Sequence, residues 1–235
     1  MSYDPETQIL VRVGVSEALD IALRAIIDPG DEIIYHEPCY VSYAPGIALA
    51  HGVPVAVPCL AKDGFAVTAE VIEQAITPKS KALVLNFPTN PTGGTMTRES
   101  LEAIARLAKR HNLLVITDEI YAELTFEGKN TSIAALPGMA ERTTFQHGSA
   151  QAYPTTGSRI GYASGAAALL YSMLPIHQSS TLFPGILSEE GAIEAPQNGA
   201  ESCAETEDQF LVTSTHITKG ANDLLHTSTL PKSSL

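Results

Sequence analysis

The sequence predicts an α/β protein with a mainly parallel, helix-covered sheet, and two observations support this fold class. From Ile9 to about Tyr162, short apolar runs alternate with stretches in which apolar residues recur at helical spacing. Glycine, proline and aspartate separate these segments, most clearly at residues 28–31. Strands that alternate with helices are typical of parallel sheets whose faces are covered by helices.

The apolar runs and amphipathic stretches set the order of the elements. We expect strands at residues 9–13, 32–35, 53–57, 82–85 and 113–117. Helices fit the spacing at residues 16–26, 40–50, 68–76 and 97–110, and the Ser16 hydroxyl is a candidate cap for the first of them. Ligands of such sheets bind at the carboxyl ends of the strands, so polar residues that follow a strand are the first candidates for a site.

Beyond Tyr162 the helical spacing weakens. Pro175 and Pro196 lie inside helix-like stretches, where a proline removes a hydrogen bond and costs about 3 kcal/mol, so we expect each to interrupt its helix. From residue 199 the chain is rich in serine, threonine, glutamate and asparagine. We therefore expect residues 1–198 to form a domain and residues 199–235 to form a weakly ordered tail.

Composition narrows the classes of function. The 235 residues carry a formal net charge of −12 and a pI near 4.9, which argues against a nucleic-acid surface. The sequence has no apolar run of membrane length and no secretory signal. The three cysteines are scattered, as in cytosolic proteins with reduced thiols, and their spacing suits no metal site. We expect a cytoplasmic protein with no metal, no membrane partner and no nucleic-acid partner.

Candidate ligand-binding residues follow the first two expected strands. Gly14, Val15 and Ser16 lie where a helix begins, and backbone N–H groups at a helix N-terminus bind phosphate. Tyr40 follows the second strand, and its ring suits stacking on a flat heteroaromatic ring. A serine cap and a packed tyrosine are the alternative explanations, because both are common.

Further candidates follow the later strands. Asn90 lies in a rigid loop of prolines and asparagines and can donate to a ligand oxygen. Asp118 ends the fifth strand, where a buried carboxylate needs a donor or a cation, and Tyr121 follows it closely. Arg159 lies in an expected glycine-flanked strand, and its guanidinium binds phosphate with two hydrogen bonds. A turn, a helix cap and an ion-paired arginine are the alternatives.

Three longer strings connect these residues. Asn90-Pro91-Thr92-Gly93, Asp118-Glu119-Ile120-Tyr121 and Arg159-Ile160-Gly161-Tyr162 occur in this order, each near a strand end. Together they resemble the class I and II aminotransferases, which are fold-type-I enzymes that use pyridoxal phosphate (PLP), and in particular the aspartate/aromatic-type branch. The resemblance covers about residues 3–198. It implies the large domain of the PLP-transferase fold, with the small domain missing and the chain truncated at both ends relative to the family.

The resemblance also implies a role for each candidate residue. The cofactor phosphate would be bound by Gly14, Val15, Ser16 and Arg159. The ring would be held by Tyr40, by the hydrogen-bonding pair Asn90 and Tyr121, and at its nitrogen by Asp118.

Gln151 differs from the family pattern at the catalytic position. The family has a lysine eight residues before the arginine of the Arg-Ile-Gly-Tyr string, and this lysine forms a Schiff base with the cofactor and moves a proton. The amide of Gln151 does neither. The resemblance therefore implies amino-group transfer between an amino acid and a 2-oxo acid by descent, with impaired or absent activity and non-covalent PLP if it is bound at all.

Three functions stay open at this point. The chain is a weakly active aminotransferase, a non-catalytic relative that binds PLP or a partner, or a truncated product without a selected function. The partner would be a second copy, in a homodimer, or a full-length paralogue. His147 precedes Gln151 by four residues and is a candidate replacement base, although an ordinary polar role explains it better, and Lys109 and Lys129 lie in other segments.

Overall fold

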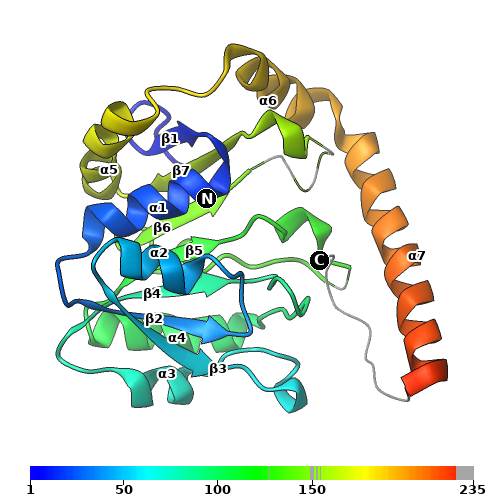
Figure 1. Cartoon of the computed structure of the whole chain (residues 1–235), viewed down its shortest axis with the longest axis horizontal. Helices are drawn as coiled ribbons and strands as arrows, with labels where there is room; N and C mark the ends of the chain where they lie inside the picture. Colours follow the sequence, from blue (N-terminus) through cyan, green and yellow to red (C-terminus); the bar gives the residue numbers. More distant parts are fainter. Residues whose placement is uncertain (127, 149–150, 152, 154, 226–235) are drawn as a thin grey trace.

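The computed structural model describes residues 1–126, 128–148, 151, 153 and 155–225, which form a seven-stranded sheet with helices packed on it (Figure 1). The strands are β1 (Ile9–Arg12), β2 (Glu32–Glu37), β3 (Val53–Pro58), β4 (Ser80–Asn86), β5 (Leu114–Asp118), β6 (Thr143–His147) and β7 (Gly161–Gly165). Their order is β1-β7-β6-β5-β4-β2-β3. Strand β7 runs antiparallel to both neighbours, and the other pairs are parallel. The predicted mainly parallel α/β sheet is confirmed.

Two hydrophobic cores lie on opposite faces of this sheet. The helices are α1 (Gly14–Ile26), α2 (Tyr43–Leu49), α3 (Ala69–Ala75), α4 (Arg98–Arg110), α5 (Ala167–Ser180), α6 (Ile186–Asn198) and α7 (Ala200–Leu225). Helices α1, α2 and α5 pack on one face, and α3 and α4 pack on the other. Neighbouring residues of one strand serve different cores: Ile33 packs towards α1 and Ile34 towards α4, and both are fully buried. The strands therefore read as continuous apolar runs.

Both interior prolines lie within helices that continue past them, so the predicted interruptions are wrong. Pro175 lies in α5 and leaves the carbonyl of Tyr171 without its helical partner. Tyr171 is 78% exposed, so water can bind this carbonyl. Pro196 lies in the last turn of α6, which ends at Asn198, and the lost hydrogen bond matters least at a helix end.

Helix α7 occupies most of the segment for which the sequence predicts a weakly ordered tail. Its 26 residues run beside the sheet and join it through α6 (Figure 1). Its alanine, glutamate and leucine residues have a high helix propensity. Sequence reasoning missed this propensity because the segment as a whole is polar. Apolar side chains along it, such as Val212 and Ile217, are exposed. Residues 226–235 of the predicted tail lie outside the described residues, and a domain boundary at residue 198 stays a prediction.

The helices of the described part of the chain were compared with the length and hydrophobicity of a membrane-spanning helix. No helix there combines the length and the hydrophobicity that a membrane span requires.

Gly161 fixes the contact between β7 and the start of α1. A Cβ atom at this position would lie 2.8 Å from both the carbonyl carbon of Gly14 and the nitrogen of Val15. Since these are backbone atoms, they move only with α1, and we expect Gly161→Ala to lower the free energy of unfolding by about 2–4 kcal/mol. Gly157→Ala, which places its Cβ in open space, should change it by less than about 0.5 kcal/mol. Urea denaturation measures both, and equal stabilities would contradict this tight contact.

Candidate cofactor site

A cavity of about 170 Å³ lies at the carboxyl ends of β1, β4 and β5, beside the start of β7. The residues that the resemblance assigns to the cofactor and to the lysine position all line it: Gly14, Val15, Ser16, Tyr40, Asn90, Asp118, Tyr121, Gln151 and Arg159. The fold thus brings together segments that are distant in the sequence. The role of each residue remains a prediction.

One end of the cavity is built to receive an anion. Helix α1 begins at Gly14, so the N–H groups of its first turn have no partner within the helix. Gly14 has a φ of +78°, and a Cβ there would lie 2.8 Å from Nη2 of Arg159. A glycine therefore keeps free the space between the guanidinium and the helix N-terminus. Both groups attract a phosphate.

Two local expectations about this end are wrong. Ser16 does not cap α1, because Val13 occupies the cap position and its N–H donates to the carboxylate of Glu17, 2.6 Å away. Arg159 does not lie in a strand. It follows the short turn Thr156–Ser158 with a φ of +50°, which is not an extended conformation, and β7 begins only at Gly161.

The opposite end of the cavity carries aromatic and amide groups. Tyr40 and Tyr43 meet edge to face, with ring centroids 5.9 Å apart. The side-chain amide of Asn90 donates to the Tyr121 hydroxyl over 3.2 Å. Two donors that touch each other and line one cavity can converge on a single ligand oxygen, as the resemblance requires of Asn90 and Tyr121.

Asp118 is a buried carboxylate held by neutral donors. The Tyr43 hydroxyl donates to its Oδ2 over 2.8 Å, and the Ile120 N–H donates to its Oδ1 over 3.3 Å. Burial raises the pKa of Asp118 above its ordinary value, although these two hydrogen bonds act in the opposite direction. Among the described residues no lysine or arginine forms an ion pair with it. A protonated ring nitrogen would supply the missing cation, so the residues fit PLP.

Sequence reasoning missed two polar residues of this cavity, Tyr43 and Asn86. Asn86 ends β4, where its amide donates to the main-chain oxygen of Asp118 over 3.0 Å and its side-chain oxygen accepts from the Asn90 N–H over 3.1 Å. Tyr43 is fully buried and looks like a core residue. The spacing along the chain gives no sign that Tyr43 and Asp118 touch, since that contact depends on how α2 packs over β5.

Gln151 lines the cavity where the family carries its lysine. None of the described residues that line this cavity is a lysine. The Lys109 amine donates to the main-chain oxygen of Pro137 over 3.0 Å, and Lys129 lines a cleft elsewhere. His147, the candidate replacement base, lines a neighbouring cavity, where it bonds to Glu123. The fold therefore provides no amine in place of the missing one among these residues.

The raised pKa of Asp118 predicts a pH-dependent cost in stability. As pH rises above 3.8, the ordinary value, the unfolded chain loses this proton before the folded protein does, so stability falls until the folded pKa is passed. We expect cofactor-free Asp118→Asn to be about 1 kcal/mol more stable than the wild type at pH 7, and the gain to vanish near pH 3.5. Urea denaturation across this range measures it. Asp63→Asn, at an exposed position, controls for loss of a charge. A variant less stable at pH 7 would contradict the burial cost.

The comparisons with known proteins agree with this geometry. The family model of the class I and II aminotransferases matches residues 1–229. The chain belongs to this family. PLP is the cofactor of these aminotransferases, and their substrates are amino acids and 2-oxo acids.

Individual aminotransferases are similar over most of the chain. YugH of Bacillus subtilis, a protein named as an aminotransferase, is 46% identical over 201 residues, which are 86% of this chain and 52% of the length of YugH. Aspartate/prephenate aminotransferase of Thermus thermophilus is 41% identical over 88% of this chain and 53% of its own. The crystal structure of an aromatic aminotransferase from Pyrococcus horikoshii superposes on the whole chain with a TM-score of 0.97 at 30% identity, over 63% of that structure. The chain spans about half the length of the curated relatives it matches.

Proposed function

We propose that this chain is a PLP-binding member of the aminotransferase family that holds the cofactor without a covalent bond and has lost most or all of its amino-group transfer. The observation that carries the proposal is the single cavity that joins an anion seat, a ring-binding pair and a buried carboxylate to Gln151. In an active relative the same cavity would contain an amine.

The proposed contacts divide the cofactor among three parts of the cavity. The N-terminus of α1 and Arg159 bind the phosphate, and Gly14 leaves room for it. Tyr40 stacks on the ring, and Asn90 and Tyr121 donate to its phenolic oxygen. Asp118, held by Tyr43, accepts from the ring nitrogen and keeps it protonated. When bound, PLP supplies an electron sink for amino-acid chemistry.

The substitution at Gln151 limits what the residues can do with this cofactor. A carboxamide stays neutral and takes up no proton at physiological pH, so it neither attaches the cofactor nor carries a proton to the substrate. Each of these functions contributes orders of magnitude to the rate. Binding and chemistry are thus separated in this chain, because the groups that bind PLP remain while the group that reacts is replaced.

Cofactor titration tests this proposal directly. We expect the purified chain to bind PLP at one site per chain, as followed by absorbance and tyrosine fluorescence, and to release it on gel filtration. Borohydride treatment should leave no cofactor attached to the cavity. Specific attachment in the wild type would overturn the non-covalent proposal. Failure to bind PLP would favour the alternative, a product without a selected function.

A partner-binding role is the second candidate, and exposed apolar side chains favour it. Leu182 and Phe183 lie between α5 and α6, Leu187 lies in α6, and each is at least 63% exposed. Exposed apolar groups of this kind mark association surfaces. We propose a second copy or a full-length paralogue as the partner. Light scattering of the purified chain tests the homodimer, which a monomer at high concentration would contradict.

A further inference from the structure

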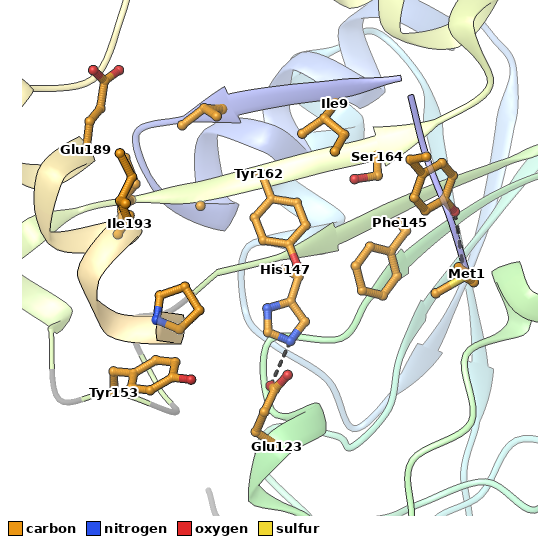
Figure 2. A pocket seen from close by; sticks show the side chains of 16 residues that line it. Met1, Ile9, Glu123, Phe145, His147, Tyr153, Tyr162, Ser164, Glu189 and Ile193 are labelled. Carbon is orange, nitrogen blue, oxygen red and sulfur yellow. Dashed lines mark hydrogen bonds and ion pairs between the residues drawn. The ribbon is translucent and has the colours of Figure 1, made fainter. Parts of the chain in front are cut away.

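A second and larger cavity lies on the face of β1, β7 and β6 that α1 and α5 do not cover (Figure 2). Its volume of about 860 Å³ falls in the range of small-molecule sites. Ile9 and Val11 of β1 line it, whereas Leu10 between them packs towards the opposite core. Ile160 is the one lining residue that it shares with the candidate cofactor site, so the two are separate places for a ligand.

The walls of this cavity suit a flat apolar group. The rings of Phe145, His147 and Tyr162 form a triangular cluster, in which the centroid of His147 lies 5.7 Å from each of the other two and those two lie 6.3 Å apart. Figure 2 shows Ile193 on α6, across the open space from these rings. Ile193 is 55% exposed, so it has apolar surface to offer. An aromatic ring that entered between α6 and the sheet would contact rings on one side and an aliphatic chain on the other.

Two acidic side chains line the cavity. Glu123 and Glu189 line it, and none of its described lining residues is a lysine or an arginine. His147 Nε2 donates to Glu123 Oε2 over 2.7 Å (Figure 2). Burial alone would raise the pKa of Glu123, but the hydrogen bond and the charge of His147 lower it below its ordinary value. Glu123 is therefore ionised at neutral pH, and a carboxylate has capacity for a further donor.

We propose that this cavity binds a small aromatic amine, with its ring against the cluster of Phe145, His147 and Tyr162 and its ammonium group on the Glu123 carboxylate. The charge of the Glu123 carboxylate selects the ligand: an ammonium gains a charge-assisted hydrogen bond, whereas a carboxylate of the same shape is repelled. The neighbouring cofactor site has the opposite character, because Arg159 and a helix N-terminus favour anions there. This inference does not depend on PLP binding.

Calorimetry on the full chain tests the inference with two probes of similar shape, 2-phenylethylamine and 3-phenylpropanoate. We expect the amine to bind and the acid to bind at least about tenfold more weakly. Glu123→Gln should weaken amine binding by about tenfold or more, because the ammonium loses its charged acceptor. Glu70→Gln removes the same charge from an exposed position of α3 and should change nothing.

A second pair of variants covers the case in which Glu123→Gln disturbs folding. Ile193→Lys places a cation in the cavity wall at a half-exposed position and should abolish amine binding. Ile186→Lys makes the same substitution in the same helix, but Ile186 is 68% exposed and does not line the cavity, so binding should persist.

Three results would overturn the inference. They are equal binding of amine and acid, equal effects of the two lysine substitutions in α6, and displacement of the amine by pyridoxine 5′-phosphate. The last compound carries the cofactor's phosphate and ring but no aldehyde to react with an amine, so displacement would locate the amine in the cofactor site instead. Amine binding that survives an excess of this compound supports the second cavity.

Discussion

Gln151→Lys is expected to convert non-covalent into covalent PLP binding. In the wild type, borohydride treatment should leave no cofactor on the peptide that contains Gln151. In the variant it should leave about one cofactor per chain at that position, because position 151 lines the same cavity as Asp118 and Arg159. Mass spectrometry of the digested protein measures the attachment, and the absorbance of the Schiff base follows its formation.

The control for this experiment is Gln178→Lys, which adds the same side chain to an exposed position of α5. It should behave as the wild type. If both variants are labelled equally, the label reports surface lysines and the assignment of the cavity is wrong. Amino-group transfer by Gln151→Lys is a separate readout: attachment without turnover would mean that a substrate-binding part, and not the amine alone, limits the reaction.

The second large effect concerns the anion seat. We expect Arg159→Met to weaken PLP binding by about 100-fold, which corresponds to about 2.7 kcal/mol, and to leave the binding of pyridoxal, which lacks the phosphate, nearly unchanged. One guanidinium nitrogen of Arg159 already donates to the main-chain oxygen of Thr156 over 3.2 Å, and Nη2 faces the space that Gly14 leaves open. Fluorescence titration with both ligands measures the difference.

Arg98→Met is the matched control, since Arg98 lies on α4 with its side chain 62% exposed. Its affinity for PLP should equal that of the wild type. An equal loss of PLP and pyridoxal affinity in Arg159→Met would contradict a phosphate contact, because a general disturbance of the cavity affects both ligands.

The sequence predicted strands β1 to β5 from their short apolar runs. Strands β2, β4 and β5 were expected because their residues are buried between two helical layers and leave a continuous apolar run. Strand β6 reads Thr-Thr-Phe-Gln-His and is fully buried, yet its polar residues carry no such run. Strand β7 is made of small residues around Tyr162, which gives a weak pattern. Polar residues thus concealed β6, and the small residues of β7 left only a glycine-flanked stretch, which the sequence placed too early, at Arg159.

The sequence predicted which residues line the candidate site better than it predicted how they contact one another. Short strings at strand ends identified the lining residues, because strand ends of a parallel sheet meet at one edge. The contact of Tyr43 with Asp118, in contrast, joins residues 75 positions apart. The turn at Arg159 likewise depends on how β7 approaches α1. Contacts of this kind depend on how the elements pack in three dimensions, so they cannot be predicted from the pattern of a single sequence.

The pairing of β1 with β7 has a consequence for the order of folding. Strand β1 is the first strand of the chain, and its hydrogen-bonding neighbour is the last. Closing so long a loop is entropically costly and slow, so we expect the strands between them to assemble first. Since Gly14 follows β1 and Arg159 precedes β7, the phosphate-binding end of the cavity would be completed only when this late pairing has formed. A chain that is still being synthesised, or one that a protease has cut between the two strands, would then be unable to retain PLP.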